Sequence, residues 1–270
     1  MSEDKEKKVY RGRIAPTPSG YLHEGHAKTF KIAWTRARME RGTIVYRNDD
    51  LDRSRCRKIY LKSAMEDLRK LKIDWDEGPD IGGEFGPYNQ SERSKLYRKA
   101  ILKLAKQGFI YPCMKSRKEI QNFGLKSKSG EEYLFPEKFR GENREYEENE
   151  ICWNISWRFR ADWGKTVNFY DQRLGNQIFE TGIHFSDFLV WRKDGTASYE
   201  LATVIDDIHM SITEIVRGED LLISSARQNL LFDAFGSKRP SFYHCRLMLD
   251  SEGNKLSKST RTLPSLFRPS

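Results

Sequence analysis

The sequence predicts an α/β fold in which a parallel sheet is covered by helices and interrupted by an inserted, mixed α/β segment. Strand-like and helix-like stretches alternate up to about residue 107, and the alternation resumes after residue 195. Parallel strands need crossover connections, which helices usually supply, so this alternation indicates a parallel sheet. Between these two parts the pattern turns polar and then β-like, which indicates an insertion.

The first part contains two expected strands. An apolar strand is expected at residues 7–15, and the run Thr-Ile-Val-Tyr-Arg predicts a buried strand at residues 43–47. Apolar residues at i, i+3 and i+4 spacing predict three amphipathic helices, which are residues 26–41, 58–71 and 90–107. Gly42 is expected to end the first of these helices.

The middle of the chain has a different character. Residues 113–150 are rich in Lys, Glu, Ser and Gly, so we expect an exposed insertion there. Apolar and polar residues alternate within 151–180, and residues 186–192 predict a strand that a turn at 193–195 continues into a hairpin. The α/β alternation then resumes with an apolar segment, a strand and a helix, at residues 201–205, 212–216 and 224–235.

Composition and charge limit the classes of protein that the chain can represent. It has 270 residues and a formal net charge of +9, with 32% charged residues. An excess of basic residues fits a polyanionic partner such as nucleic acid, and equally fits a merely soluble basic surface. The polar start lacks a secretory signal, and no apolar run reaches the roughly 18 residues of a membrane helix. We expect a cytoplasmic protein without a membrane partner, and a monomer, because the fold needs no partner.

The four cysteines are Cys56, Cys113, Cys152 and Cys245. They are widely scattered and form no Cys-x-x-Cys pair, so neither a disulfide framework nor a zinc knuckle is indicated. This usage also fits a reducing compartment.

A turn rich in proline and glycine leads from the first strand into the first helix, between Arg13 and His26. The start of a helix offers N–H groups and a positive dipole end to a phosphate, and His23 and His26 can donate further hydrogen bonds. Gly25 permits close approach of a ligand. Two surface histidines at the start of a helix are the alternative interpretation of this pattern.

A second candidate lies near the C-terminus, where Lys255-Leu-Ser-Lys-Ser259 follows a polar segment. The ammonium groups of Lys255 and Lys258 could meet a polyphosphate as charge develops on it. An ordinary solvated loop explains the same residues.

Acidic and basic residues also follow predicted strands. Asp49, Asp50 and Asp52 follow the second strand, where functional acids often lie in α/β sheets, although aspartates also cap helices. Arg217 follows the strand at 212–216, and an arginine there can clamp a carboxylate through two hydrogen bonds, or form an ion pair with Glu219 or Asp220.

Taken together, these segments resemble the class I aminoacyl-tRNA synthetases in their glutamyl form. The segment from Arg13 to His26 resembles the nucleotide-binding signature of that family, and Lys255 to Ser259 resembles its second signature loop. Three further segments resemble the glutamyl enzymes: residues 47–52, 199–207 and 215–220. The resemblance implies a Rossmann-type nucleotide-binding domain with an inserted subdomain, and ATP, Mg²⁺, L-glutamate and tRNA as substrates or partners.

The resemblance also implies roles for individual residues. Five consecutive residues should lie against glutamate: Arg13, Ile14, Ala15, Pro16 and Thr17. Arg217 should contact the side-chain carboxylate of glutamate or lie close to it, and Tyr199 should close the glutamate pocket. Asp49 stands where the family has a glutamate that contacts the substrate amino group, one methylene longer. The residues expected to face ATP are His23, Gly25, His26, Asp220 and Lys258, with Lys255 beside them in the second loop.

The resemblance divides the chain into parts at defined residues. We expect two halves of the catalytic domain at 1–110 and 195–245, an acceptor-binding-like subdomain at 111–194, and the lysine loop with a tail at 246–270. The sequence continues for about ten residues after Ser259, so we expect no anticodon-binding domain. That layout resembles the shortened branch of the family, whose members glutamylate the queuosine base at the wobble position of tRNA(Asp).

One departure from the pattern of the shortened branch and two alternative functions remain. The shortened branch often holds zinc through closely spaced cysteines, whereas Cys113 stands alone here, so we expect no zinc. Aromatic packing should then hold the insertion, through residues such as Tyr111, Tyr133, Phe135 and Phe139. The chain could also be a truncated synthetase that charges a tRNA acceptor end, or a ligase that transfers glutamate to a small amine.

Overall fold

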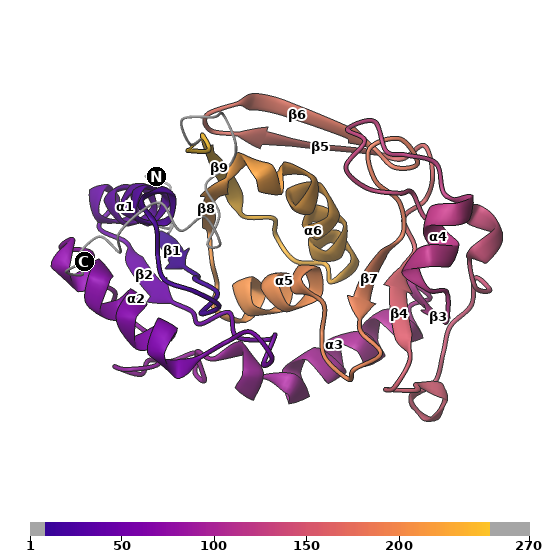
Figure 1. Ribbon diagram of the computed structural model, residues 1–270, viewed down its shortest axis with the longest axis horizontal. Helices are drawn as coiled ribbons and strands as arrows, with labels where there is room; N and C mark the ends of the chain where they lie inside the picture. Colours follow the sequence, from indigo (N-terminus) through magenta and orange to yellow (C-terminus); the bar gives the residue numbers. More distant parts are fainter. Residues whose placement is uncertain (1–8, 249–270) are drawn as a thin grey trace, which may run out of the picture. The chain divides into compact units, whose positions relative to one another are not determined.

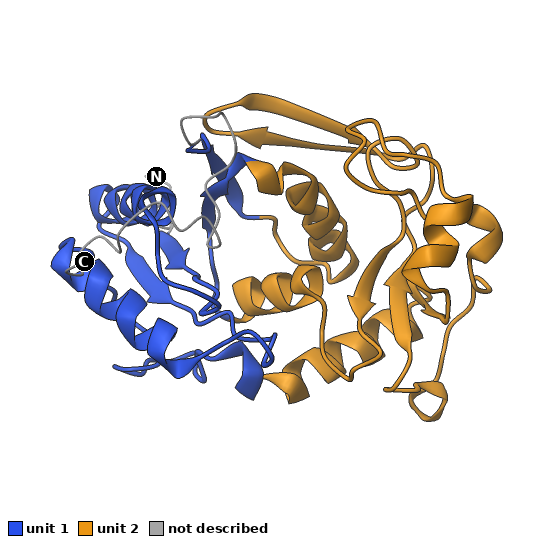
Figure 2. Cartoon of the chain, viewed as in Figure 1, with its two compact units in different colours: residues 1–92, 210–219, 240–270 blue, residues 93–209, 220–239 orange. Residues whose placement is uncertain are grey.

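The computed structural model describes residues 9–248 of the chain. The contacts between residues divide it into two compact units, which Figure 2 shows in different colours. Unit 1 takes its described residues from 1–92, 210–219 and 240–270, and unit 2 is formed by 93–209 and 220–239. Each unit is therefore assembled from segments that are far apart in the sequence.

Unit 1 is an α/β structure with parallel strands (Figure 1). Its elements, in chain order, are β1 (Arg11–Ile14), α1 (Glu24–Met39), β2 (Thr43–Tyr46), α2 (Lys58–Lys70), the short 3₁₀ helix η1 (Gln90–Glu92), β8 (Glu214–Gly218) and β9 (Ser241–Cys245). Strands β1 and β2 pair in parallel, with Arg11 opposite Thr43, and β8 pairs in parallel with β9, with Arg217 opposite His244. The predicted parallel sheet is therefore confirmed.

Hydrogen bonds also join β1 to the start of β8, although about 200 residues separate them. The N–H of Thr213 donates to the carbonyl oxygen of Arg11 at 2.9 Å, and the N–H of Arg11 donates to Oγ1 of Thr213 at 2.9 Å. The carboxyl ends of β1, β2 and β8 therefore belong to one edge of the unit. In α/β sheets, ligands bind at that edge.

Apolar residues of both helices pack on these strands. The buried core joins Phe30 and Ala37 of α1, Leu68 of α2, and Ile14 and Ile44 of the strands. The spacing of the buried residues in α1 is that of one helix face, as the sequence predicted. Burying such a face removes apolar surface from water, at about 25 cal/mol per Å².

A buried carboxylate links α1 to β8. Glu214 is 3% exposed and accepts hydrogen bonds from Nε and Nη2 of Arg36, each at 2.7 Å. The hydroxyl of Tyr10 donates to the same carboxylate at 2.5 Å. Burial and the bond to Glu214 raise the pKa of Tyr10 far above its usual value. This network fixes the helix that begins at the predicted phosphate turn.

Gly42 has a different function from the one expected. Helix α1 ends with Arg41 in the left-handed region at φ 52°, and the N–H of Gly42 donates to the carbonyl oxygen of Ala37 at 2.8 Å. A Cβ at Gly42 would lie 2.6 Å from the carbonyl oxygen of Tyr10. Glycine is therefore needed for close backbone approach, and Arg41 provides the left-handed turn.

Unit 2 combines four helices with antiparallel strands. Its elements are α3 (Ser94–Lys106), β3 (Ile110–Cys113), α4 (Arg117–Phe123), the 3₁₀ helices η2 (Glu137–Phe139) and η3 (Glu148–Glu150), β4 (Ser156–Phe159), β5 (Thr166–Asp171), β6 (Gly175–Glu180), β7 (Phe188–Trp191), α5 (Tyr199–His209) and α6 (Leu222–Ala234). The 3₁₀ helix η4 (Glu219–Leu221) immediately precedes α6. Strand β4 lies between β3 and β7, and β5 and β6 form a hairpin.

Large aromatic residues form the core of unit 2. Trp157 and Trp191 face each other across β4 and β7 and are almost completely buried. Of the aromatic residues expected to hold the insertion, Tyr111 and Phe135 are buried, Phe139 is half-buried, and Tyr133 is 36% exposed.

Three expectations about secondary structure differ from the structure. The helix expected at 90–107 begins at Ser94, because residues 90–92 form η1. The turn at 193–195 is present, but beyond it only Ala197 pairs with Trp191 before α5 begins. The segment 113–150 is less exposed than expected, since Leu134 and Tyr146 are buried. No helix within residues 9–248 combines the length and hydrophobicity that crossing a lipid bilayer requires.

Candidate active site

The turn between β1 and α1 is held by backbone hydrogen bonds on both sides. The N–H of Asp49 donates to the carbonyl oxygen of Pro16 at 3.1 Å, and the N–H of Arg57 donates to that of Pro18 at 2.9 Å. Both prolines are buried, and neither has an N–H of its own to satisfy. The segment after β2 therefore fixes the path of the predicted glutamate-binding residues, of which Ile14 is buried and Ala15 half-buried.

The two histidines of the turn lie against each other at the start of α1. His23 directly precedes the helix, and its N–H donates to Nδ1 of His26 at 3.4 Å. The centroids of the two rings are 3.7 Å apart, with 30° between the ring planes. A Cβ at Gly25 would lie 3.0 Å from Cε1 of His23, so glycine gives the ring room to fold back over the helix end. Both imidazoles therefore belong to a helix start that can bind an anion.

Asp49 forms a buried, two-pronged ion pair with Arg47. Nε and Nη2 of Arg47 donate to the two carboxylate oxygens of Asp49 at 2.6 and 3.2 Å. The arginine is 1% exposed and the aspartate 7% exposed. Ionised carboxylates have about four acceptor positions, so Asp49 can still accept a hydrogen bond from a ligand. The neighbouring Asp50 instead accepts from the N–H and Oγ of Ser91, both at 2.8 Å, and thereby holds η1, to which Ser91 belongs.

Asp52 caps the next turn. Its carboxylate accepts from Oγ of Ser54 at 2.6 Å and from Nε of Arg55 at 2.6 Å. These two hydrogen bonds lower the pKa of Asp52 to about 2. Among the three acids after β2, Asp49 is the one that lies beside the turn from β1.

Arg13 and Arg217 are both 5% exposed and belong to the neighbouring strands β1 and β8. Nη1 of Arg13 donates to the carbonyl oxygen of Val216 at 3.1 Å. Val216 directly precedes Arg217, so the Arg13 guanidinium contacts β8 one residue before Arg217. Nε of Arg217 donates to Nε2 of His244 at 3.4 Å, and His244 is completely buried. Two guanidinium groups thus belong to the strand edge that also contains Asp49. Such a set suits a ligand with carboxylate and ammonium groups.

The remaining predicted residues lie elsewhere in the chain. Tyr199 begins α5 in unit 2 and is 41% exposed. Asp220 lies in η4 and is exposed, whereas its neighbour Glu219 accepts a hydrogen bond from the N–H of Leu247 at 3.1 Å. Lys255 and Lys258 lie outside the described residues, so their predicted contact with phosphates stays a prediction.

Two residues of this site carry signals that the sequence reasoning did not use. Arg47 ends the run of a buried strand two residues before an acid, which is a pattern for a local ion pair. His244 lies in β9, a strand that follows α6 and completes a strand–helix–strand unit after β8. Neither residue was assigned a role, and both hold a predicted ligand-binding residue in place.

A cavity of about 560 Å³ opens near this edge within unit 1. Pro18, Asn48 and Asp50 contribute to its wall from the strand-end loops, and Arg57 and Lys62 contribute from the side of α2. No predicted glutamate-binding residue lines it. The cavity therefore adjoins the predicted site without containing it.

The family described as "tRNA synthetases class I (E and Q), catalytic domain" matches residues 9–266 of the chain. The chain belongs to this family. Its α/β fold with a parallel sheet is the Rossmann-type fold of the class I synthetases, and its activity is that of an aminoacyl-tRNA synthetase-like ligase.

Two relatives that are similar in sequence differ in name. The chain is 42% identical to the "Glutamyl-Q tRNA(Asp) synthetase" of Symbiobacterium thermophilum, with 92% of the chain and 77% of that protein covered. It is 38% identical to the "Glutamate–tRNA ligase" of Sulfurihydrogenibium sp., with 92% of the chain and 52% of that protein covered. The chain therefore spans about half the length of the second relative.

A solved structure has the same fold. The glutamate–tRNA synthetase of Elizabethkingia anophelis matches with a TM-score of 0.80 and 29% identity, covering 93% of the chain and 53% of that protein. The agreement includes the nucleotide-binding fold that the turn from Arg13 to His26 predicted.

The cysteines of the described residues form no disulfide, and Cys113 is buried at the end of β3. Cys152 is exposed and donates to Oδ1 of Asn154 at 2.6 Å. Within residues 9–248, no group of three or more His, Cys, Asp or Glu residues is placed to hold a metal ion. The expected absence of zinc stays a prediction for metal analysis of the purified protein.

Proposed function

We propose that the protein activates L-glutamate with ATP and then transfers the glutamate to the queuosine base at the wobble position of tRNA(Asp). The proposed activation of glutamate is supported by a set of buried charged residues at the ends of β1, β2 and β8. Arg13, Asp49 and Arg217 are each at least nine-tenths buried there. Ligands bind at the carboxyl edge of a parallel sheet, so charged side chains of both signs concentrated at that edge favour a ligand that is itself charged.

Each of these residues has a proposed task. Arg217 binds the side-chain carboxylate of glutamate through two parallel hydrogen bonds, with its Nε side oriented by His244. Asp49 accepts a hydrogen bond from the α-ammonium group, directly or through water, because it is one methylene shorter than the family's glutamate. Arg47 holds the Asp49 carboxylate in one orientation. Arg13 and the backbone up to Thr17 lie along the amino acid.

ATP is proposed to bind beside the start of α1. His23 and His26 donate hydrogen bonds to phosphate oxygens, together with the N–H groups of the first helical turn. The family resemblance gives further roles to Asp220, at the ribose, and to Lys258, at the phosphates. Mg²⁺ would supply positive charge to the phosphates. The phosphates would be its main ligands, because the carboxylates of Asp49 and Asp50 accept hydrogen bonds from Arg47 and Ser91.

Activation requires placement and charge stabilisation rather than a protein nucleophile. An oxygen of the α-carboxylate attacks the α-phosphorus of ATP, and the bond from that phosphorus to the bridging oxygen breaks, releasing pyrophosphate. A hydroxyl of the bound nucleoside then attacks the carbonyl carbon of glutamyl-adenylate, and AMP leaves. Excluding water from the adenylate protects it from hydrolysis.

The name of the Symbiobacterium relative supports queuosine as the acceptor, and the name of the Sulfurihydrogenibium relative supports the tRNA acceptor end as the alternative. Two RNA substrates distinguish these two possible acceptors. One is an anticodon stem-loop of tRNA(Asp) that contains queuosine, and the other is an acceptor minihelix with a CCA end. We expect mass spectrometry to detect glutamyl-queuosine in the stem-loop after incubation with glutamate, ATP and Mg²⁺. A stem-loop with guanosine at the wobble position is the matched control.

Glutamate on the minihelix, with none on the queuosine stem-loop, would replace this proposal with acceptor-end charging. Glutamate on neither RNA, with normal glutamate-dependent pyrophosphate exchange, would favour a small amine as the acceptor. Because the exchange reaction needs no acceptor, it tests the activation step separately.

A further inference from the structure

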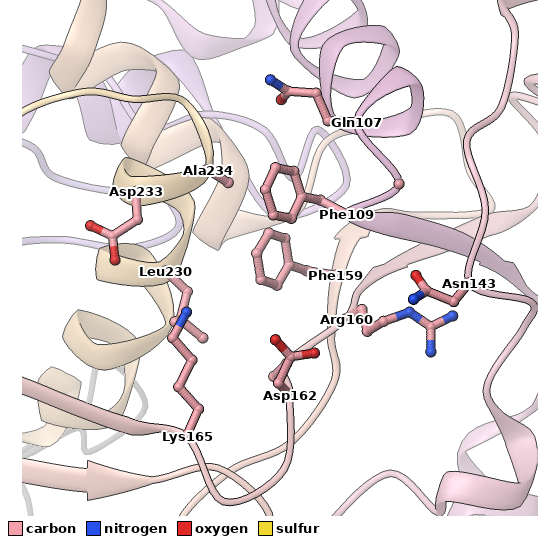
Figure 3. A pocket seen from close by; sticks show the side chains of 12 residues that line it. Gln107, Phe109, Asn143, Phe159, Arg160, Asp162, Lys165, Leu230, Asp233 and Ala234 are labelled. Atoms are coloured by element: carbon pink, nitrogen blue, oxygen red, sulfur yellow. The ribbon is translucent and has the colours of Figure 1, made fainter.

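A second pocket lies entirely within unit 2, and no predicted residue lines it. It has a volume of about 330 Å³, at the lower end of the range for small-molecule sites. The segment from the end of α3 to the start of β3, the end of β4 and helix α6 surround it (Figure 3).

The walls of the pocket are apolar on two sides. The rings of Phe109 and Phe159 lie parallel within 7°, with their centroids 5.9 Å apart. In Figure 3 they lie across from Leu230 and Ala234 of α6. Phe159 is 4% exposed and also stacks on Phe188, so its position is fixed from behind. A flat group with apolar faces fits between such walls.

The rim of the pocket is polar and available for binding. Four exposed residues, Gln107, Asn143, Asp162 and Lys165, contribute to it, and their side chains make no hydrogen bond or ion pair with the residues described here. They offer two amides, one carboxylate and one ammonium group, which together provide both donors and acceptors.

Charges of both signs surround the pocket, which limits the ligand. Asp162 and Lys165 have opposite charges, and Asp233 is paired with Arg239 at 2.8 and 2.5 Å. Arg160 also lines the pocket, and its Nη2 donates to the carbonyl oxygens of Gly141 and Glu142 at 2.6 and 2.9 Å. A strongly anionic or cationic ligand would meet a like charge on the rim. A neutral, flat ring with several donors and acceptors along its edge is favoured, and a nucleobase has these properties.

We propose that this pocket binds a guanine-type base from an unpaired nucleotide of the RNA substrate. The base lies between the aromatic and aliphatic walls, and the carboxylate of Asp162 accepts hydrogen bonds from the two adjacent N–H groups that guanine presents. Adenine, cytosine and uracil do not present this pair of donors. The choice of RNA as the source rests on the proposed function, and a free guanine nucleotide has the same recognition chemistry.

The test compares Asp162→Ala with the wild-type full-length chain. The probes are the queuosine-containing anticodon stem-loop, followed by fluorescence anisotropy, and GMP, IMP and AMP, followed by calorimetry. We expect the variant to bind the stem-loop about tenfold more weakly, the usual effect of one lost base contact. Wild-type protein should prefer GMP to IMP, which lacks the 2-amino group, and the variant should lose that preference.

Glu148→Ala is the matched control, because Glu148 is exposed in unit 2 and lies outside the pocket. It should bind the stem-loop as the wild type does. Both substituted positions are exposed, so thermal unfolding should be unchanged, and glutamate-dependent pyrophosphate exchange should also be unchanged in both variants.

Two results would overturn the inference, and a third would distinguish its failure from that of the proposed function. Unchanged binding of both the stem-loop and GMP by Asp162→Ala would overturn it. Weaker binding of GMP with unchanged binding of the stem-loop would overturn RNA as the source. If wild-type protein binds no stem-loop at all, the proposed function fails, and the preference for GMP over IMP still decides whether the pocket takes guanine.

Discussion

Each unit of the molecule contains a buried Arg–Asp pair, and the two pairs differ in what surrounds them. In unit 1, Arg47 and Asp49 are two residues apart, directly after β2. In unit 2, Arg93 and Asp206 are 113 residues apart, with Nε to Oδ1 at 2.6 Å, and the hydroxyl of Tyr97 lies 3.0 Å from both carboxylate oxygens. The second pair therefore joins the start of α3 to α5.

This difference suggests different roles for the two pairs: the pair in unit 2 stabilises the tertiary structure, and the pair in unit 1 positions a side chain. A pair that joins distant segments holds the tertiary structure, because removing either partner leaves an uncompensated buried charge between two helices. A pair within one loop joins nothing distant, yet still costs desolvation of both ions. This pair lies beside Pro16 and at the edge with Arg217, and in the proposed function it orients a carboxylate for the ligand. The two pairs should therefore respond to substitution in different measurements.

The largest effect is expected for Arg93→Met. Asp206 would stay buried without the guanidinium that pairs with it, so we expect the free energy of unfolding to fall by about 3–5 kcal/mol. Urea unfolding measures the change. The double variant Arg93→Met/Asp206→Leu should recover most of it, since both charges are then removed. A loss below about 1 kcal/mol in the single variant would contradict a stabilising role for the pair.

The next effect is expected for Arg217→Lys. Lysine keeps the charge but loses the planar fork that binds a carboxylate with two hydrogen bonds. The kcat/KM for glutamate in pyrophosphate exchange should fall, with a ratio of wild type to variant that corresponds to about 2–4 kcal/mol. Arg192→Lys is the matched control, because Arg192 is 45% exposed and pairs with Asp194 on the surface. Equal exchange kinetics in both variants would remove Arg217 from the glutamate site.

Asp49→Asn tests the comparison most directly. The substitution keeps the shape of the side chain and removes its charge. If Asp49 makes the proposed charge-assisted contact with the substrate ammonium group, the ratio of the kcat/KM values should correspond to a loss of about 1.5–3 kcal/mol. The parallel substitution Asp206→Asn should lower unfolding stability and leave the KM for glutamate unchanged. The interpretation of the two pairs is wrong if Asp206→Asn raises the KM for glutamate while Asp49→Asn lowers only the unfolding stability.

The smallest effect concerns an exposed cap in unit 2. The backbone N–H and the hydroxyl of Ser116 both donate to Glu119 at 2.9 Å, and the backbone bond leads the contacts that lower the Glu119 pKa to about 2. In an unfolded chain the pKa of Glu119 is 4.5. The ionised carboxylate therefore contributes its full stabilisation of the start of α4 above pH 4.5, and this contribution is lost as the pH falls toward 2.

Amide chemical shifts of Ser116 and Glu119 should therefore titrate near pH 2, and this titration should disappear in Glu119→Gln. A midpoint near 4.5 would show that the cap does not form. Because the carboxylate is exposed, the urea midpoint of the whole chain should not change, in contrast to the buried pair of the same unit.

The sequence was most informative where local pattern and chemistry coincide. The period of the apolar residues predicted α1 and α2, and the β-branched run predicted β2, because each burial pattern is local. The turn from Arg13 to His26 was visible through its prolines, glycines and histidines. Pattern was less informative between residues 113 and 150, where irregular loops bury Leu134 and Tyr146 without a repeating spacing.

By itself, the sequence determined the family, the parallel α/β fold and the residue types that a glutamate and nucleotide site needs, because motifs and periodicity are local properties of the chain. Only the tertiary structure decided which residues from distant parts of the chain contact one another. Arg13 reaches β8 across about 200 residues, Arg217 lies against His244, and Phe109 and Phe159 line a pocket that no motif marks. Such contacts depend on strand order and on the packing of distant helices, which spacing along the chain does not contain.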